Sequence, residues 1–250
     1  WLRPVPRHPA PPMSSRVETV YLDGESLTPE TLVELSTGQL AIDLSEAAWA
    51  KVRAAREMIE RILESGEVVY GINTGFGSFA STTIDPHKLK ELQENLIRSH
   101  AAGVGNPLSR ARTRMLLALR ANVLAKGHSG ISCDTLKRVL AAFNKDCLSV
   151  VPVKGTVGAS GDLAPLAHLA LGLMGEGKMW DPATGAMRPA AEVLAANGLK
   201  PLHLKPKEGL ALINGTQLIA SIGSEAVVRA KNIARQADVV AAMTLEALKG

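Results

Sequence analysis

The chain has 250 residues, enough for one large domain or two ordinary ones, and its 46% hydrophobic content is ample for a core. Aromatic residues make up only 3%, so the core must be built from aliphatic side chains. The net charge of +4 is too mild, and the basic residues too scattered and too poor in aromatic neighbours, to indicate a surface for nucleic acid.

The cysteines, the histidines and the hydropathy exclude further classes of protein. Cys133 and Cys147 stand apart without a CxxC pattern, so we predict a reducing, cytoplasmic compartment and neither a zinc site nor a disulfide framework. The six histidines include no HExxH, which leaves metal catalysis without visible ligands. No apolar run reaches the roughly 18 residues that a membrane span requires.

The first residues, "WLRPVPRHPAPPM", are rich in proline. They contain no apolar segment of the kind found in a signal peptide. Met13 looks like a more natural start, and we expect residues 1–13 to form a disordered extension.

The next part of the chain predicts a small α/β portion. Short apolar segments predict three strands, over residues 16–22, 39–45 and 67–72. Between the second and third strands, residues 47–66 have the spacing of an amphipathic helix that Gly66 closes. A long loop rich in Gly, Ser and Thr follows, over residues 73–86.

From Pro86 onward the pattern is helical. Predicted helices cover residues 87–102, 109–126, 132–145 and 189–197, and another begins around residue 162. Ser109 and Ser132 are candidate N-caps, and Pro165 falls in a first turn, where proline is tolerated.

One helical pattern runs from Thr216 to Lys249 and would be about 50 Å long at 1.5 Å per residue. A domain of this size cannot cover such a helix, so it belongs in a bundle or an oligomer. The chain then stops at "LEALKG", and we expect it to be a truncated piece of a longer protein.

Residues 154–171, "KGTVGASGDLAPLAHLAL", place three glycines at a spacing of three around one serine. This is not a P-loop, because Asp162 follows Gly161 where a Lys-Ser/Thr pair is required. It is not a nucleophile elbow either, because glycine follows Ser160 directly. The pattern G-x-x-G-x-x-G also differs from that of a dinucleotide loop.

The tripeptide Ala159-Ser160-Gly161 has the composition that backbone cyclisation needs. With small residues on both sides of the serine, the Gly161 nitrogen can approach the Ala159 carbonyl carbon. Loss of water from the ring and from the serine leaves an exocyclic methylene conjugated to an imidazolone. The sequence thus predicts a strong electrophile made from the chain itself.

A competing interpretation rests on "GFGSFA" at residues 75–80, the nearest match to a dinucleotide-binding loop. There the expected helix is replaced by a polar run that ends in Asp85-Pro86. Binding of a nicotinamide cofactor would favour an oxidoreductase.

"GTVGASGDLAPLAHLALG" resembles the signature of the aromatic amino-acid ammonia-lyases, in which Ala-Ser-Gly forms a methylidene-imidazolone (MIO) group. The resemblance extends through "VVYGINTGFGSFA", "ELQENLIRSHAAGVG", "RMLLALRANVLAKGHSGIS" and "LKPKEGLALINGTQ", from about residue 18 to 250. It implies an MIO cofactor formed from Ala159, Ser160 and Gly161, with no external cofactor and no metal. An ordinary glycine-rich turn is the alternative.

The resemblance also implies a substrate. Ser99-His100 in "RSHAAG" occupies the selectivity position, where phenylalanine lyases carry Phe-Leu and tyrosine lyases His-Leu. The pattern is similar to the branch that acts on the small molecule L-histidine to give trans-urocanate. A tyrosine or phenylalanine lyase or an aminomutase of the same family stays open, as does a non-catalytic truncated scaffold.

Four further assignments depend on the resemblance. Tyr70, otherwise a core tyrosine at the end of a strand, is the implied base for the β-proton, and helix N-termini could stabilise its anion. His100, otherwise an ordinary residue at a helix end, is implied to contact the substrate imidazole. Asn214, otherwise the N-cap of the long helix, is implied to bind substrate. Asp162, otherwise an N-cap, is implied to polarise the loop during cyclisation.

The resemblance completes the predicted fold, which is mainly α. A small N-terminal α/β portion carries the MIO loop, and the start of a long-helix bundle follows. The predicted domains are residues 14–209, with the MIO loop, and residues 210–250, the truncated bundle. The family's chains are about twice as long and form homotetramers, so we expect this chain alone to be inactive. His128 and His168 are expected to be structural.

Overall fold

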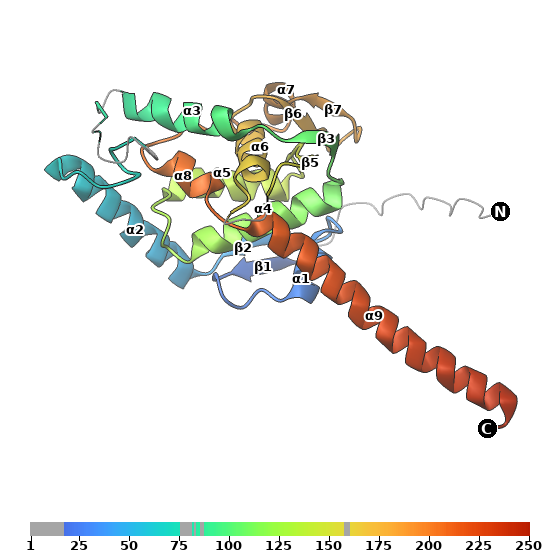
Figure 1. The fold of residues 1–250 in the computed structure, drawn as a ribbon. Helices are drawn as coiled ribbons and strands as arrows, with labels where there is room; N and C mark the ends of the chain where they lie inside the picture. Colours follow the sequence, from blue (N-terminus) through green and yellow to red (C-terminus); the bar gives the residue numbers. More distant parts are fainter. Residues whose placement is uncertain (1–17, 76–81, 83, 86–87, 158–160) are drawn as a thin grey trace.

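The structure of the chain is a computed structural model that describes residues 18–75, 82, 84–85, 88–157 and 161–250. The helices gather into one body, and the last helix projects from it (Figure 1). The predicted extension over residues 1–13 and the tripeptide's Ala159 and Ser160 lie outside the described residues.

The N-terminal α/β portion is confirmed. Strands β1 (Thr19–Leu22) and β2 (Ala41–Leu44) pair in parallel, and helix α1 (Pro29–Leu35) connects them. Sequence analysis missed α1, which is seven residues long and begins after an N-cap whose side chain, Thr28, accepts the Thr31 N–H. Helix α2 (Glu46–Ser65) follows and ends at Gly66 in the left-handed conformation, as predicted.

The middle of the chain is helical, as the sequence predicted. Three helices form here, α3 (Leu89–His100), α4 (Arg110–Ala125) and α5 (Cys133–Asn144). Ser109 and Ser132 cap α4 and α5 by accepting backbone N–H groups of their first turns. Buried residues occur on every side of α4, which marks it as the central helix of the body.

Two small antiparallel sheets that the sequence did not predict lie beside the helices, on one side of the body (Figure 1). Strand β3 (Val104–Pro107) pairs with β5 (Pro152–Lys154). Strands β4 (Leu148–Ser149), β6 (Lys178–Trp180) and β7 (Met187–Pro189) form a second sheet, after which α7 (Ala190–Ala196) begins.

Three further helices follow in the C-terminal part of the chain: α6 (Leu163–Leu173), α8 (Glu208–Ile213) and α9 (Gln217–Leu248). Helix α6 packs against α3 and α8. The predicted long helix is confirmed as α9, with 32 residues and a length of about 48 Å. The predicted domain boundary after residue 209 falls within α8, and the division into domains stays a prediction.

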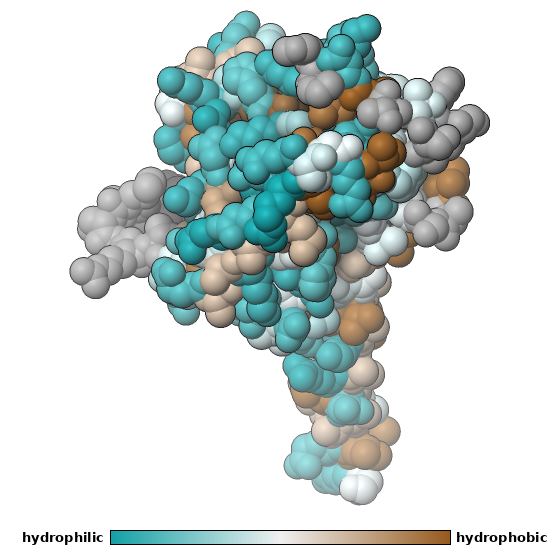
Figure 2. Space-filling model, turned by 90° about the vertical axis from the view of Figure 1, so that its left-hand side faces the viewer, coloured by the Kyte–Doolittle hydropathy of each residue, from teal (hydrophilic) through white to brown (hydrophobic). Residues whose placement is uncertain are grey.

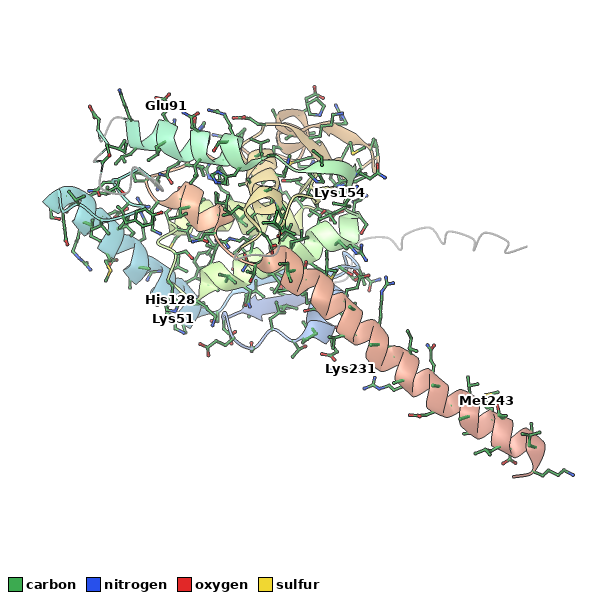
Figure 3. All side chains as sticks on the ribbon, in the orientation of Figure 1. Lys51, Glu91, His128, Lys154, Lys231 and Met243 are labelled. Atoms are coloured by element: carbon green, nitrogen blue, oxygen red, sulfur yellow. The ribbon has the colours of Figure 1, made fainter. Side chains whose placement is uncertain are left out.

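Helix α9 leaves the body after its first half. Lys231 still reaches back to Glu30 of α1 through an ion pair of 2.8 Å, whereas Met243 lies far out on the projecting part (Figure 3). Apolar side chains are exposed along this projecting part, where the surface view also shows hydrophobic patches (Figure 2). They are Ile233, Val239, Val240, Met243, Leu245 and Leu248.

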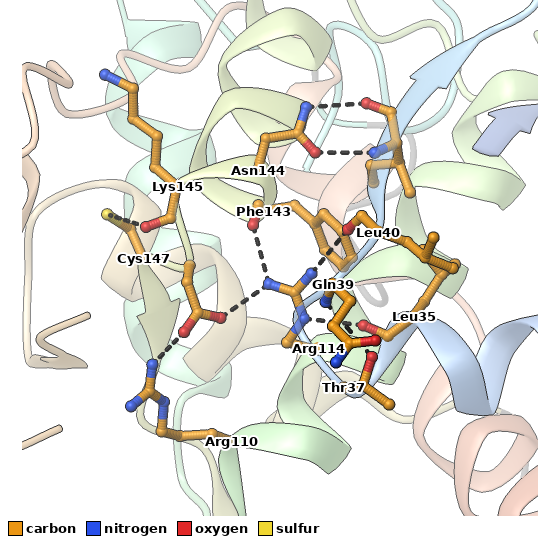
Figure 4. A network of polar contacts seen from close by, with 12 residues as sticks. Leu35, Thr37, Gln39, Leu40, Arg110, Arg114, Phe143, Asn144, Lys145 and Cys147 are labelled. Carbon is orange, nitrogen blue, oxygen red and sulfur yellow. Dashed lines mark hydrogen bonds and ion pairs between the residues drawn. The ribbon is translucent and has the colours of Figure 1, made fainter. Parts of the chain in front are cut away.

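A polar network connects α4 with the end of α1, the segment before β2 and the end of α5 (Figure 4). Arg114 of α4 is 4% exposed and donates to the carbonyls of Leu35, Leu40 and Phe143. Its Nη1 also forms an ion pair of 2.8 Å with Asp146, which Arg110 contacts from the other side. This network is called the Arg114 anchor below.

The described residues also bear on compartment and metal binding. Cys133 and Cys147 are both free thiols. No group of three or more His, Cys, Asp or Glu that could hold a metal occurs among the described residues. Within the same part of the chain, no helix is long and apolar enough to cross a membrane.

Candidate active site

The glycine-rich stretch connects β5 to α6 and is tightly packed where it begins. A Cβ added to Gly155 would lie 3.2 Å from the Ala164 Cβ and 3.2 Å from the Gly103 Cα. The start of the loop is therefore held between α6 and the segment before β3. Its centre, residues 158–160, is not described, and the description resumes at Gly161.

Gly161 has a φ of 120°, a conformation that favours glycine. The next residue, Asp162, is fully buried at the N-cap position of α6. Asp162 takes the N-cap position that the sequence suggested, but its side chain makes no capping hydrogen bond to α6.

Asp162 instead caps the neighbouring helix. Its Oδ2 accepts the backbone N–H of Ile219, in the first turn of α9, at 3.0 Å. Its own N–H donates to the Gly215 carbonyl at 2.6 Å. The carboxylate therefore stabilises the N-terminus of α9 and joins it to the N-terminus of α6. The other oxygen, Oδ1, is buried and has no hydrogen-bond partner among the described residues.

Asn214 does not cap α9, and that sequence interpretation is wrong. It is the C-cap of α8, and its N–H donates to the Leu210 carbonyl at 3.0 Å. Thr216 takes the N-cap position of α9. The sequence reading missed α8, a helix of only six residues, and so assigned its final cap to the next helix. The residues between the two helices, 214–216, are called the α8–α9 turn below.

Ser99 and His100 form the end of α3, as the sequence placed them. The His100 Nδ1 lies 2.9 Å from the Leu96 carbonyl and 3.1 Å from the Ser99 Oγ. Because a carbonyl can only accept, Nδ1 carries the proton in this contact, and Nε2 of the neutral ring is then an acceptor.

The two residues border a mainly apolar pocket of about 420 Å³. Its other lining residues are Gly75, Thr82, Ile84, Leu92, Asn95 and Leu96. A pocket of this size at the end of α3 can hold a small planar molecule.

Tyr70 lies in a turn, so the predicted strand over residues 67–72 is wrong. The Asn73 side chain explains the turn: its Oδ1 accepts the Val69 N–H at 2.9 Å, and its Nδ2 donates to the Glu67 carbonyl at 2.7 Å. These bonds use backbone groups that a strand would have paired with a neighbour. The Tyr70 side chain is 57% exposed in this chain.

The structure thus brings some of the predicted site residues together. Gly161 and Asp162 contact the segment that begins with the α8–α9 turn. Ser99 and His100 lie on α3, which packs against both α6 and α8. Tyr70 lies on the turn after α2.

Sequence analysis missed buried polar residues beneath the site. Arg120 of α4 is 1% exposed and donates to Asn214 and Gln217. Glu208, fully buried at the start of α8, accepts from the Ser132 N–H, the Thr135 hydroxyl and the Lys205 N–H. One signal was available for the first, because an arginine interrupts the apolar run "MLLALRANVLA".

The two histidines expected to be structural differ in their surroundings. His168 is half-buried on α6, and its Nε2 accepts the Gly103 N–H at 3.0 Å, which agrees with the expectation. Burial lowers the pKa of His168. His128 is exposed.

Comparisons with known proteins agree with the sequence motifs. A family model described as aromatic amino acid lyase matches residues 27–250. Histidine ammonia-lyase from Bos taurus is 65% identical over 231 residues, which cover 92% of this chain and 35% of that protein.

Two solved structures are similar to the chain. The crystal structure of histidine ammonia-lyase from Trypanosoma cruzi has a TM-score of 0.87 and 52% identity, over 93% of this chain and 44% of that one. Tyrosine aminomutase from Streptomyces globisporus has a TM-score of 0.84 and 40% identity, over 91% of this chain and 42% of that one. The chain spans about a third of the bovine relative and less than half of either solved chain.

Proposed function

The chain belongs to the aromatic amino acid lyase family, and on that premise we propose that it is part of a histidine ammonia-lyase. Such an enzyme eliminates ammonia from L-histidine to give trans-urocanate. The observation that carries the proposal is the 65% identity to the bovine enzyme of that name, against 40% to the tyrosine aminomutase. We also propose a cytoplasmic location.

The proposed prosthetic group is an MIO formed from Ala159, Ser160 and Gly161. The described neighbours fit it, because Gly161 holds a positive φ and the buried Asp162 beside it has an oxygen with no partner among the described residues. Such a group would supply an electrophilic carbon for the substrate amine, and the neighbouring residues Gly161 and Asp162 would hold it in place.

The remaining steps fall to side chains of this chain. Tyr70 takes the β-proton, which is weakly acidic and requires a base. Ser99 and His100 set the selectivity, since the His100 Nε2 can accept a hydrogen bond from an imidazole N–H. The side chain of Asn214, exposed at the C-cap of α8, binds substrate. Asp162 holds the end of the cyclised loop against α9.

We further propose a homotetramer in which the projecting part of α9 packs into a bundle. Its exposed apolar side chains support this, because monomers rarely leave such a patch open to water. The chain covers 35% of the bovine relative, and we propose that further substrate-binding residues lie in the part of the enzyme that it does not include. This chain alone should therefore produce no urocanate from L-histidine, and robust production would contradict the proposal.

The full-length protein provides the main test. It should release urocanate from L-histidine, followed by ultraviolet absorbance, and Tyr70→Phe should lower turnover by about 10²-fold or more. Tyr21→Phe is a matched control, because Tyr21 is the other tyrosine of the chain and is similarly exposed, at 63% against 57%. Near-normal turnover by Tyr70→Phe would refute the role of the base.

A tyrosine or phenylalanine lyase, or an aminomutase, is the alternative within the family. It is distinguished by offering L-histidine, L-tyrosine and L-phenylalanine to the wild type and to a variant with Phe-Leu in place of Ser99-His100. We expect the wild type to prefer L-histidine and the variant to lose that preference. Unchanged selectivity would count against the assigned position.

A further inference from the structure

Arg120 lies under the α8–α9 turn and contacts both helices that the turn connects. Its Nη1 donates to the Asn214 carbonyl at 2.9 Å and to the Gln217 Oε1 at 2.8 Å. Its Nη2 donates to the Ala211 carbonyl. One guanidinium thus bridges the last turn of α8 and the first residue of α9.

These acceptors are ones that the local backbone leaves open. Ala211 is among the last four residues of α8, whose carbonyls have no partner within the helix. A planar guanidinium with several fixed donors can reach three oxygens at once, whereas a lysine ammonium acts as a single point charge. The geometry therefore requires arginine specifically.

Gly215 lies close against the side chains of Arg120 and Gln217. A Cβ added to Gly215 would lie 2.7 Å from the Arg120 Nη1 and 2.2 Å from the Gln217 Oε1. The Gly215 carbonyl meanwhile accepts the Asp162 N–H. The turn is held between Arg120 below it and Asp162 beside it.

This contact is energetically costly for the fold. Arg120 is 1% exposed, its Nε has no partner, and it forms no ion pair with any carboxylate in the part of the chain that the structure describes. Burial lowers the pKa of Arg120 to about 10. A buried cation held only by neutral oxygens is poor stabilisation, which favours a role in positioning.

We infer that Arg120 is a positioning residue that fixes the α8–α9 turn against Asp162, and so sets where the Asn214 side chain stands relative to Gly161. The inference rests on the proposed function for its catalytic meaning. Its structural content, that the guanidinium holds the Asp162–Gly215 contact, can be tested separately.

The test compares Arg120→Lys with Arg114→Lys in the full-length protein. Both changes keep the charge and remove the fork of a buried arginine on α4. Two quantities are measured: the KM and kcat for L-histidine, and amide hydrogen exchange at Asp162 and Ile219, whose N–H groups report the contact between α6 and α9. A loss of folded protein lowers kcat and leaves KM unchanged.

Arg120→Lys should raise KM, lower kcat/KM by about tenfold or more, and speed exchange at Asp162 and Ile219 by about tenfold. Arg114→Lys should lower the unfolding temperature and leave KM and these two amides unchanged. Gln217→Met, which removes one acceptor and keeps the arginine, should shift KM and exchange in the same direction by less. If Arg120→Lys does not fold, the Gln217→Met variant provides the test of the inference.

Unchanged KM and unchanged protection of both amides would overturn the inference. The two proposals fail separately. A wild-type protein that releases no urocanate from L-histidine contradicts the proposed function, and amide exchange then decides on the role of Arg120 alone.

Discussion

Helix α4 carries two buried arginines, Arg114 in its N-terminal half and Arg120 in its C-terminal half, and their surroundings differ. Arg114, 4% exposed, meets the carboxylate of Asp146 and three backbone carbonyls (Figure 4). Arg120, 1% exposed, meets only neutral oxygens among the described residues. The Asp146 carboxylate compensates the positive charge of Arg114, whereas the neutral oxygens around Arg120 leave its charge uncompensated.

This difference separates stability from function within one helix. The Arg114 anchor ties the ends of α1 and α5 to α4, and its failure should unfold the body. The Arg120 contacts hold a three-residue turn beside Asp162, and their failure should misplace the site within a folded body. Substitutions around Arg114, the anchor end of α4, and around Arg120, its site end, should therefore have different effects.

The largest effect is expected at the site end, from Gly215→Ala. The new Cβ would lie 2.2 Å from the Gln217 Oε1 and 2.7 Å from the Arg120 Nη1, so these two side-chain ends must move and the hydrogen bond between them is lost. We expect kcat/KM for L-histidine in the full-length protein to fall about 100-fold, since small misplacements have such costs. Gly223→Ala is the control, because a Cβ there meets nothing within 4 Å, and it should leave kcat/KM unchanged.

At the anchor end, Asp146→Asn should reduce stability without affecting the chemistry. Asparagine tolerates the φ of 54° at this position, so the change removes mainly the charge that Arg110 and Arg114 share. We expect unfolding in denaturant to require about 2 kcal/mol less, with KM unchanged.

The control for this variant is Lys231→Ala. It removes an ion pair whose two side chains are both more than half exposed, so stability should change by about 0.5 kcal/mol or less. Equal losses in the two variants would mean that the Arg114 anchor is no stronger than a surface pair.

A third variant lowers the stability of helix α4 as a whole. Ser109 caps α4 by accepting the Arg112 N–H at 3.3 Å, and Ser109→Ala should cost about 1 kcal/mol of unfolding free energy. Ser109→Thr keeps a capping hydroxyl and should lose less. The loss of the cap leaves Arg114 and Arg120 in place within the folded protein, so KM should stay the same. A changed KM would argue against separate roles for the two arginines.

The smallest expected effect is a dependence of the unfolding temperature on pH, which arises from His168 of α6. The neutral His168 ring accepts the Gly103 N–H, and burial lowers the pKa of His168. In the unfolded chain His168 has its ordinary pKa of about 6.5 and therefore binds a proton at a higher pH than in the folded protein. The stability that the neutral ring contributes is thus present above that pH and is lost as the pH falls below it. His168→Gln, with an acceptor that does not titrate, should show a shallower loss of unfolding temperature between pH 7 and pH 5.5. Identical slopes for the two proteins would contradict this assignment.

The sequence predicted what local patterns determine. Ser109 and Ser132 begin their helices as expected, Gly66 ends one, and α9 follows its long period. Short elements escaped, because strands of two to four residues such as β4 depend on partners distant in the chain. The strand expected at Tyr70 failed because Asn73 bonds its own backbone.

The sequence identified candidate residues of the site but did not reveal the hydrogen bonds that those residues make. Asp162 was identified, but the helix it caps begins far along the chain, 57 residues separating it from Ile219. Arg120 was missed because its acceptors lie more than 90 residues away. Burial of a polar side chain is a property of the folded chain, and one sequence does not reveal its partner.

Peptide mass measurement on the full-length protein tests the central claim most directly. If Ala159, Ser160 and Gly161 cyclise, the peptide that contains Ser160 will be lighter than its sequence by two water molecules, and Ser160→Ala will remove that difference. An unmodified mass for this peptide in a preparation that converts L-histidine to urocanate would contradict the account.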